Sequence, residues 1–550
     1  MPIHLRGAAE HNLKHIDIDF PDGLTVVTGV SGSGKTSLVF DTLDHEARRR
    51  FLEVYALGSS DLRLSPARVD AITGLSPAIA VGQNLLNRNP NSTLASASGI
   101  HPFLRLLYAN FAERCCSKCG TILSILTEDE IIAYLADLTS RHPVQVYAPL
   151  LKDVPGSHRT LLAALEEQFD PSSLLVDGQP WQGEPLPVDQ PHSLAIELAA
   201  FEHRAPIDSL RGVLQTARAL GTFALTVQTP ERSQTLSSAQ VCTACGHWFS
   251  DLEPRHFHTP CPHCQGQGCL ACEGTGITPD AAAVRLGGLR FTDLLALNVD
   301  EALSFFTQAS IPASSARLSS EITRRLAALQ RVGLGYISLD RPSPSLSRGE
   351  SQRVRLGVAL TSRLEDLLHV LDEPTIGQHP ADVLRLLPAL RELRGPVIYV
   401  EHDRIAAAQA DHAIDLGPGA GVRGGQVVFK GTPAALWGAD TSTGHYFSLR
   451  ERVSIPEPRP LPDAFLTIHG AHLRNLQDID ISIPLARLTV VTGVSGSGKS
   501  TFVEDVLHAS LAKNEPLGCR SIEGTLPKSV MVDQSPIGQN PRSNPATYTK

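Results

Sequence analysis

The chain has 550 residues, of which 42% are hydrophobic, and its formal net charge is −9. This length exceeds one hydrophobic core, so we expect about three or four domains. No run approaches the roughly 18 to 20 apolar residues of a membrane span, and the N-terminus lacks the order of a signal peptide, which predicts a cytoplasmic protein outside the membrane. The acidic balance disfavours a uniformly nucleic-acid-binding surface and leaves room for a local basic stripe.

A segment near the start of the sequence recurs near its end. HNLKHIDIDFPDGLTVVTGVSGSGKTS at 11–37 matches RNLQDIDISIPLARLTVVTGVSGSGKST at 474–501, with one extra residue before the shared LTVVTG. In each copy, alternating apolar residues predict paired strands, LTVVTG predicts a buried strand, and a glycine-rich turn then opens a helix. Each copy continues to a glutamine and an Asn-Pro segment, so the module is duplicated, and the second copy stops at Lys550.

Both copies carry the P-loop pattern G-x-x-x-x-G-K-[ST], as GVSGSGKT and GVSGSGKS, between the predicted strand and helix. The glycines let backbone amides face the phosphates of ATP, the lysine places a cation on the β- and γ-phosphates, and the next hydroxyl binds Mg²⁺. A glycine-rich turn without ligand is the alternative, which the complete duplicated pattern disfavours. The predicted nucleotide-binding residues are Gly29, Ser31, Gly32, Ser33, Gly34, Lys35, Thr36 and Ser37 in the first copy, and Gly493, Ser495, Gly496, Ser497, Gly498, Lys499, Ser500, Thr501 and Gln534 in the second.

A signature-like segment follows in the middle of the chain. LSRGESQRVRLGVAL at 346–360 resembles the signature of ABC-type ATPases, which implies nucleotide contacts from Ser347, Gly349 and Glu350. The signature usually has two glycines, and the first is replaced here by Arg348. Because glycine lets the helix N-terminus approach the γ-phosphate of an opposing module, this arginine alters that contact or adds a positive charge to it.

The acidic residues of an ATPase come next. LLHVLDEPTIG at 367–377 resembles a Walker B strand, in which Asp372 would hold Mg²⁺ and Glu373 would polarise the attacking water. His402 follows another apolar strand, where the ABC family places a histidine against the γ-phosphate, and Gln83 lies between the P-loop and the signature. Each motif alone fits a solvated turn or a structural histidine, whereas their order predicts catalytic roles for Glu373, His402 and Gln83.

Eight of the ten cysteines form C-x-x-C pairs, which in a cytosolic chain indicate metal ligation rather than disulfides, with redox motifs or free thiols as the alternative. Each pair offers two thiolates to a tetrahedral Zn²⁺, so the pattern predicts two closed structural sites. The pairs are Cys116–Cys119, Cys242–Cys245, Cys261–Cys264 and Cys269–Cys272. Spacing does not decide which pairs share a metal; we prefer a nested arrangement, first with fourth and second with third. Cys115 and Cys519 are expected to be ordinary thiols.

The order of these motifs is that of UvrA proteins, in which cysteine pairs lie between the first P-loop and the signature. Further segments are similar to UvrA sequences: GLSPAIA at 74–80, LRLLYA at 104–109, LEPRHF at 252–257, IDLGPGAG at 414–421 and DQSPIGQNPRSNPATYT at 533–549. The chain resembles the UvrA family over essentially its whole length.

The resemblance implies an α/β fold of ABC-type P-loop ATPase modules with an inserted α+β domain and Cys₄ zinc modules. It implies ATP, Mg²⁺ and Zn²⁺ as cofactors, and damaged double-stranded DNA, a UvrB-type protein and a second copy of the chain as partners. The expected function is ATP-dependent recognition of DNA damage and loading of the UvrB-type partner in nucleotide excision repair, without nuclease activity. Alternatives are a UvrA-like protein that protects DNA from a drug, and a nucleotide-gated binding module with little turnover.

The expected domains follow from the same resemblance. Their ranges are 1–115 for the start of the first ABC module, 116–241 for a domain resembling the UvrB-binding domain, 242–276 for a zinc module, 277–451 for the signature and Walker B part, 452–463 for a proline-rich linker and 464–550 for the start of the second module. The DNA-clamping insertion of relatives is expected to be missing, because only residues 265–268 separate the third and fourth cysteine pairs. ABC sites take their signature from an opposed module, and the second copy has none before Lys550, so we expect weak hydrolysis by an isolated chain.

Overall fold

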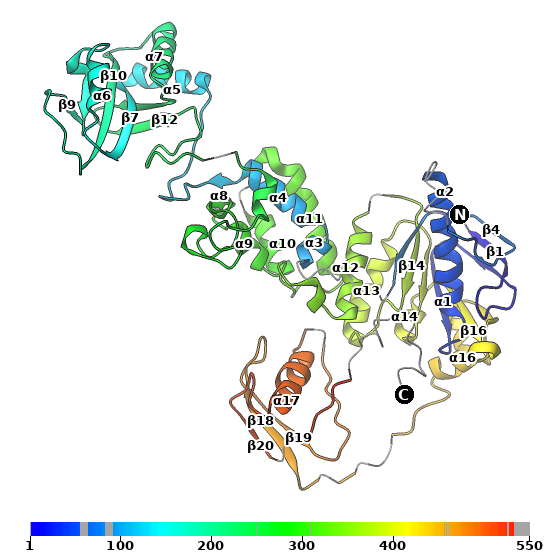
Figure 1. Cartoon of the computed structure of the whole chain (residues 1–550). Coiled ribbons are helices and arrows are strands. Elements are labelled where there is room, and N and C mark those ends of the chain that lie inside the picture. Colours follow the sequence, from blue (N-terminus) through cyan, green and yellow to red (C-terminus); the bar gives the residue numbers. More distant parts are fainter. Residues whose placement is uncertain are drawn as a thin grey trace. The chain divides into compact units, whose positions relative to one another are not determined.

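The computed structural model describes residues 2–55, 64–82, 92–249, 251–309, 311–362 and 364–532, apart from 456, 458, 461, 495, 525 and 526. The chain divides into two compact units, which are described separately (Figure 1). The first unit comprises Met1–Pro90, Ala328–Tyr336 and Ser343–Lys550, and the second comprises Asn91–Ala327 and Ile337–Pro342. Among the described residues, no helix is long and apolar enough to span a bilayer.

The first unit is built around a six-stranded sheet of order β17-β16-β3-β15-β14-β5. Its strands are β3 (Leu24–Gly29), β5 (Ala78–Val81), β14 (Leu368–Asp372), β15 (Val397–Val400), β16 (His412–Gly417) and β17 (Gln426–Gly431). All neighbours pair in parallel except β17, which runs antiparallel to β16. Every residue of β3 is buried, as predicted for this run, because β15 and β16 flank it on both sides.

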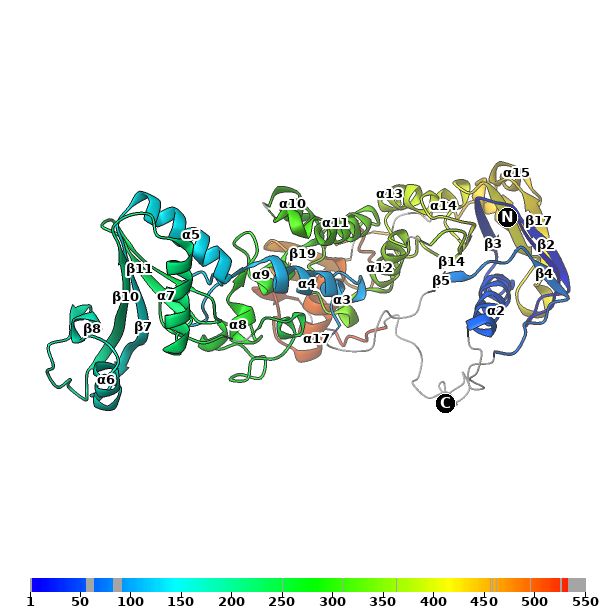
Figure 2. The same ribbon diagram turned by 90° about the horizontal axis from the view of Figure 1, so that it is seen from above.

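Helices cover both faces of this sheet. Helices α1 and α2 lie on one face and α13 and α14 on the other (Figures 1 and 2). The helices of this first module are α1 (Lys35–Leu38), the π-helix η1 (Val39–Asp44), α2 (His45–Tyr55), α12 (Arg348–Leu360), α13 (Pro380–Arg391), α14 (Arg404–Ala408), α15 (Pro433–Gly438) and α16 (Ser442–Phe447), with 3₁₀ turns η7 (Ser343–Ser345) and η8 (Gly421–Arg423). This is the layered α/β arrangement expected from strands that alternate with helices.

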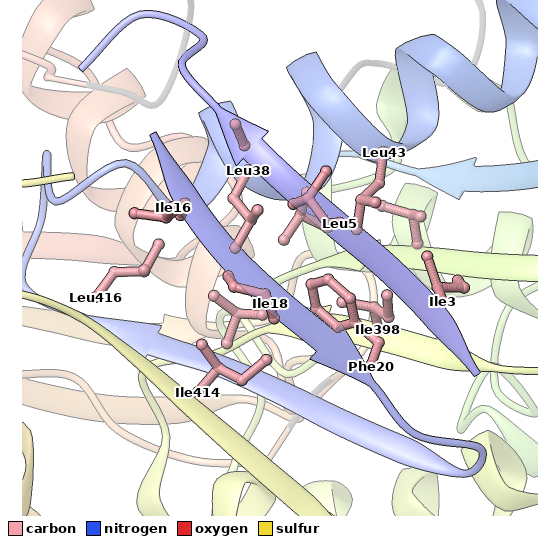
Figure 3. Packing of buried hydrophobic residues seen from close by; sticks show 14 of the residues in the cluster. Ile3, Leu5, Ile16, Ile18, Phe20, Leu38, Leu43, Ile398, Ile414 and Leu416 are labelled. Atoms are coloured by element: carbon pink, nitrogen blue, oxygen red, sulfur yellow. The ribbon is translucent and has the colours of Figure 1, made fainter. Parts of the chain in front are cut away.

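A small antiparallel sheet of order β2-β1-β4 packs beside the large one. Its strands are β1 (Ile3–Ala8), β2 (Ile16–Phe20) and β4 (Ala71–Thr73). Alternate residues of β1 and β2, including Leu5 and Ile18, point into a core shared with Leu38 of α1, Ile398 of β15 and Ile414 of β16 (Figure 3). The alternating sequence pattern therefore correctly predicted paired strands, and the structure shows that their apolar face is buried.

The second module repeats the small sheet and the P-loop helix. Strands β18 (Phe465–Ala471), β19 (Ile479–Pro484) and β20 (Ser521–Glu523) pair in the order β19-β18-β20. The π-helix η9 (Thr501–His508) and α17 (Ala509–Lys513) lie between β19 and β20 along the chain. The shift in register between Leu5 and Ala8 of β1 recurs between Ile468 and Ala471 of β18. Buried Cys519 belongs to the small core of this module.

The buried strand predicted for LTVVTG of the second copy is wrong for this structure. Residues 488–493 are all described, and none lies in a strand. Leu488 is 94% exposed and Val490 is 72% exposed. The strands that flank β3 come from 397–417 of the first copy, and no strand occupies the equivalent place among the described residues of the second, so this run has no ladder to join.

The second unit holds a six-stranded antiparallel sheet of order β12-β11-β7-β10-β8-β9. Its elements are α5 (Glu128–Arg141), β7 (Val144–Pro155), α6 (Arg159–Glu166), η3 (Pro171–Ser173), β8 (Leu174–Val176), β9 (Gln179–Pro180), β10 (Pro191–Phe201), α7 (Ile207–Ala219), β11 (Ala224–Gln228) and β12 (Ser233–Ser237). Helices α5 and α7 lie along one side of β7, β10 and β11, and these five elements share a core (Figure 2). This is an α+β domain within 116–241.

The rest of the second unit is mainly helical and carries the eight paired cysteines. It comprises α3 (Leu94–Ala97), α4 (His101–Phe111), β6 (Glu113–Arg114), η4 (Pro254–Phe257), η5 (Leu270–Cys272), α8 (Pro279–Ala282), β13 (Val284–Arg285), α9 (Phe291–Ala296), α10 (Val299–Gln308), η6 (Ala313–Ser315) and α11 (Ala316–Arg331), which continues into the first unit. Tyr108, Phe257 and Phe291 form an aromatic cluster with ring centroids 5.1 to 5.8 Å apart. This cluster fixes α4 and α9 around η4.

Candidate nucleotide site and cysteine clusters

The first P-loop joins the end of β3 to α1 by a turn that needs glycine. Gly29 has φ +137°, and a Cβ there would lie 2.2 Å from the carbonyl oxygen of Leu416. The Lys35 side chain folds back over the loop, and its Nζ donates to the carbonyls of Gly29 at 2.9 Å and Val30 at 3.0 Å. Thr36 is exposed at the start of the helix, so its hydroxyl is accessible. The loop has the curled form that the sequence predicts.

The acidic pair lies at the same edge of the sheet. Asp372 ends β14, two strands from β3, and the carboxyl ends of parallel strands are where such sheets bind ligands. The pKa of Asp372 is raised to about 6, mainly by burial and also by the charge of Glu373, while Lys35 opposes the shift. Burial lowers the pKa of Lys35, while Glu373 and Asp372 act in the opposite sense. The carboxyl ends of β3 and β14 thus bring the two carboxylates and the ammonium group to one edge of the sheet.

His402 completes this group. Its Nε2 lies 3.6 Å from a carboxylate oxygen of Glu373. Burial lowers the pKa of His402, Lys35 lowers it too, and Glu373 raises it. The structure thus brings together the predicted residues Lys35, Asp372, Glu373 and His402.

Sequence reasoning missed Glu401, which anchors this edge. Its carboxylate is buried and accepts bonds from the Thr375 amide at 3.0 Å, the Thr375 hydroxyl at 2.6 Å, the His402 amide at 2.9 Å and the Asp403 amide at 3.1 Å. Burial raises the pKa of Glu401 and these bonds lower it. The carboxylate therefore ties the loop after β14 to the loop after β15. In the sequence, Glu401 could be noticed only as an acidic residue between an apolar strand and His402.

A second missed carboxylate supports β3. Asp415 in β16 is 2% exposed and accepts hydroxyl bonds from Thr28 at 2.8 Å and Thr443 at 2.7 Å. It also acts on Lys35 by raising its pKa, against the effect of burial. Asp415 was visible in the sequence only as part of the segment IDLGPGAG, so its contact with Thr28 required the fold.

The signature-like segment forms the N-terminus of α12. Ser347 caps the helix: its Oγ accepts the Glu350 amide at 3.2 Å, and the Glu350 carboxylate accepts the Ser347 amide at 2.8 Å. Tyr336 donates its hydroxyl to the other oxygen of Glu350 at 2.5 Å. At Gly349 a Cβ would lie 3.1 Å from the carbonyl oxygen of Ile376. The nucleotide contacts of these signature residues remain a prediction.

The second P-loop repeats the local geometry of the first. Lys499 Nζ donates to the carbonyls of Gly493 at 2.7 Å and Val494 at 2.8 Å. The Ser497 amide donates to Val494 at 3.3 Å, as the Ser33 amide donates to Val30 at 3.1 Å. The turn therefore forms without a strand before it. Among the predicted residues, Gln83, Ser495 and Gln534 lie outside the described residues.

The eight paired cysteines form two clusters of four sulfurs. In the first, Cys116 lies 3.6 Å from Cys245 and Cys119 lies 3.5 Å from Cys242. In the second, Cys261 lies 3.9 Å from Cys269, Cys264 lies 3.8 Å from Cys272, and Cys269 lies 3.7 Å from Cys272. Thiolates about 2.3 Å from a tetrahedral Zn²⁺ are about 3.8 Å apart, so both clusters fit this ion. Each could hold a metal.

The nested pairing predicted from the sequence is wrong. The first cluster joins the cysteines on either side of the inserted domain, where the Leu126 amide donates to the Ser237 carbonyl at 2.9 Å and holds the two ends of the domain together. In the second cluster, the Gly268 amide donates to Cys264 Sγ at 3.2 Å and the Gly276 amide to Cys272 Sγ at 3.3 Å. Tight turns after each pair therefore let neighbouring pairs face each other.

The sheet, the P-loop after its central strand, the acidic pair and the signature-like helix define a P-loop ATPase of the ABC type. The whole chain is 31% identical to 74% of UvrABC system protein A of Staphylococcus aureus (strain N315). It is 31% identical to 73% of the protein of that name from Bacillus subtilis (strain 168). A crystal structure of UvrA2 from Deinococcus radiodurans matches all of this chain and 70% of that chain, with 29% identity and a TM-score of 0.67. No protein-family profile matches. The chain belongs to the UvrA family of DNA-repair ATPases.

Proposed function

We propose that this chain binds and hydrolyses ATP to recognise damaged double-stranded DNA and to load a UvrB-type partner in nucleotide excision repair. The observation that carries the proposal is the convergence of Lys35, Asp372, Glu373 and His402 at one sheet edge in a chain of the UvrA family. We also propose that this activity takes place in the cytoplasm, in keeping with a DNA substrate. The reaction is ATP hydrolysis, and the site has no nuclease role in this proposal.

The residues divide the chemistry of ATP hydrolysis. Lys35 leaves the carbonyls of Gly29 and Val30 for the β- and γ-phosphates, as the P-loop pattern predicts. Thr36 and Asp372 would hold Mg²⁺, which neutralises phosphate charge when bound. Glu373 orients the attacking water and accepts its proton, and His402 contacts the γ-phosphate. Glu401 fixes the positions of Glu373 and His402 relative to each other, because it joins the two loops that carry them.

The test is steady-state ATP hydrolysis by the full chain with a duplex that carries one bulky adduct, with the matched intact duplex, and without DNA. Repair predicts stimulation by the damaged duplex and binding that weakens steeply with salt. Equal stimulation by both duplexes, or none, would contradict a damage-recognition role. Protection of DNA against a single drug, without preference for the adduct, would instead support the resistance alternative.

A nucleotide-gated binding module is the second candidate function. It is favoured by the exposed run 488–493, which leaves the second P-loop without a supporting strand among the described residues. Nucleotide binding without phosphate release, in the presence of damaged DNA and a UvrB-type protein, would select this alternative. A homodimer could supply the opposed signature, so turnover that rises with chain concentration would favour assembly.

Zinc is proposed for both cysteine clusters, as a structural ion that ties each set of thiolates together. Metal content measured on double variants tests this pairing. Cys116→Ser with Cys242→Ser, within one cluster, is expected to remove one ion, and Cys116→Ser with Cys269→Ser is expected to remove both. The reverse result would restore the nested pairing. A chain that carries no zinc would contradict the assignment.

A further inference from the structure

Each copy of the module carries an identical turn ahead of its P-loop. His11 and Arg474 occupy the left-handed region, with φ +52° and +54°. Closing bonds follow each of them: the Leu13 amide donates to Glu10 at 3.0 Å, and the Leu476 amide donates to Leu473 at 3.1 Å. Both leucines are buried, which anchors the turn against the module core. An asparagine separates the left-handed residue from the leucine in both copies: Asn12 in the first and Asn475 in the second.

The asparagine of each turn contacts its own P-loop at the same position. Asn12 Nδ2 donates to the carbonyl of Gly32 at 3.1 Å, and Asn475 Nδ2 donates to the carbonyl of Gly496 at 2.8 Å. Both acceptors are the fourth residue of the P-loop pattern. The side chains also lie close under the sixth residue, where a Cβ on Gly34 would be 3.0 Å from Asn12 Oδ1. The contact is therefore duplicated along with the module.

A bond to this carbonyl controls the conformation of the loop. The Gly32 carbonyl and the Ser33 amide belong to one peptide plane, so an outward carbonyl fixes the direction of the amide. That amide closes the turn onto Val30 at 3.1 Å. If the peptide rotated, this closing bond would be lost and the Gly32 carbonyl oxygen would point into the loop, where an acceptor facing a phosphate anion is unfavourable.

We infer that Asn12 and Asn475 are positioning residues for the two nucleotide sites, each of which fixes the fourth P-loop carbonyl so that the loop amides face the phosphates. The inference deepens the proposed nucleotide binding and rests on it. Neither asparagine touches a reacting atom, so the effect is on nucleotide affinity rather than on bond cleavage.

Asn12 and Asn475 differ in the number of carbonyls to which they donate. Asn12 Nδ2 also donates to the Gly421 carbonyl at 3.2 Å, in the loop 417–425, and the Gly421 amide donates to the Gly32 carbonyl at 2.9 Å. The Gly425 amide adds a bond to Ser33 at 2.9 Å. The described part of the second module has no such loop beside Gly496. Asn12 therefore holds two segments together, whereas Asn475 holds one.

Titration of the full chain with a fluorescent ADP analogue tests each site in isolation. Lys499→Ala weakens the second site and Lys35→Ala weakens the first, so the intact site dominates each titration. In the Lys499→Ala chain, Asn12→Ala should weaken binding about tenfold for two lost bonds, and in the Lys35→Ala chain Asn475→Ala should weaken it about threefold for one. Asn12→Asp, which keeps the shape and loses the donor, should behave as Asn12→Ala. Each asparagine variant is the matched control for the other site.

The outcomes separate the inference from the proposed function. If neither parent chain binds nucleotide, the proposed function fails. If both bind and Asn12→Ala, Asn12→Asp and Asn475→Ala keep their affinities within twofold, the positioning role is overturned. A positioning role raises KM for ATP and leaves kcat at saturation unchanged, while a fall in kcat with unchanged KM would contradict it. Should Asn12→Ala fail to fold, the exposed Asn475 decides the question in the Lys35→Ala chain.

Discussion

The two P-loop modules share a sequence and differ in what surrounds it. Leu24 and Val26 of β3 are 3% and 0% exposed, whereas Leu488 and Val490, at the same places in the second copy, are 94% and 72% exposed. Both P-loops nevertheless curl alike and hold their lysines on the same two carbonyls. The turn is thus encoded locally, while the strand requires neighbours, since burying each apolar side chain contributes about 1.5–3 kcal/mol only when something covers it.

The largest difference between the modules concerns hydrolysis. The first module has Glu373, and the described part of the second module has no equivalent residue. Glu373→Gln keeps the shape of the side chain and loses the base, so kcat is expected to fall by about 10²–10⁴-fold while nucleotide binding persists. Steady-state phosphate release measures this effect, with Glu392→Gln, on an exposed ion pair with Arg331, as the matched control. Equal turnover in both variants and the parent would remove Glu373 from the mechanism.

The two P-loops are also expected to differ in their affinity for nucleotide. Removal of a charge-assisted contact by Lys35→Ala should weaken first-site binding by about ten- to a hundredfold. Lys499→Ala should remove a weaker binding step, because its loop lacks the supporting strand. Isothermal titration of both variants resolves the two steps. If Lys35→Ala leaves both steps intact, the assignment of the first site is wrong.

The loop 417–425 is a difference that a pair of glycines can test. A Cβ on Gly425 would lie 1.8 Å from the Asn12 carbonyl oxygen, whereas a Cβ on Gly421 meets nothing within 4 Å, and both have positive φ. Gly425→Ala should therefore weaken first-site nucleotide binding about tenfold by displacing the loop, and Gly421→Ala should lose only about 1 kcal/mol of stability from backbone strain. Fluorescent nucleotide titration and thermal unfolding separate the two. Similar affinity in both variants would show that the loop does not support the first P-loop.

The smallest expected effect follows from the pKa of Asp372. A carboxyl whose pKa is raised to about 6 on folding stabilises the fold below its usual pKa of 3.8, and this stabilisation is lost as pH rises through about 6. Asp372→Asn should therefore stabilise the nucleotide-free first module at pH 7.5 by about 1 kcal/mol, after allowance for partial exposure, and much less at pH 4. Thermal unfolding at both pH values measures this. Destabilisation at pH 7.5 would show that the ionised carboxylate is already compensated.

The sequence predicted most of the first site because its residues belong to motifs with fixed local chemistry. Lys35 follows a complete P-loop pattern, and Asp372 and Glu373 end an apolar run, so each could be placed on an element before the fold was known. Glu401 and Asp415 could not be assigned, because their partners come from other strands. Their roles depend on which strands become neighbours, and composition does not specify that order.

The predictions of the cysteine pairing and of a strand at 488–493 were wrong for the same physical reason. Four C-x-x-C pairs fit two metals in several ways, and long-range contacts such as the bond between Leu126 and Ser237 bring Cys116 and Cys242 to one place. The run at 488–493 has strong strand propensity, yet a parallel strand is stable only when its ladder partners are present. Local patterns thus predicted turns and ligand types, while long-range contacts decided their surroundings.

Hydrogen–deuterium exchange of the two equivalent segments tests the central comparison most directly. The account predicts that amides of 24–29 exchange at least about a hundredfold more slowly than those of 488–493 in the nucleotide-free chain, since one segment is a central strand and the other is solvent-exposed. Addition of ATP should protect the first P-loop more than the second. Equal protection of the two segments would contradict the account and would show that other residues cover the second run.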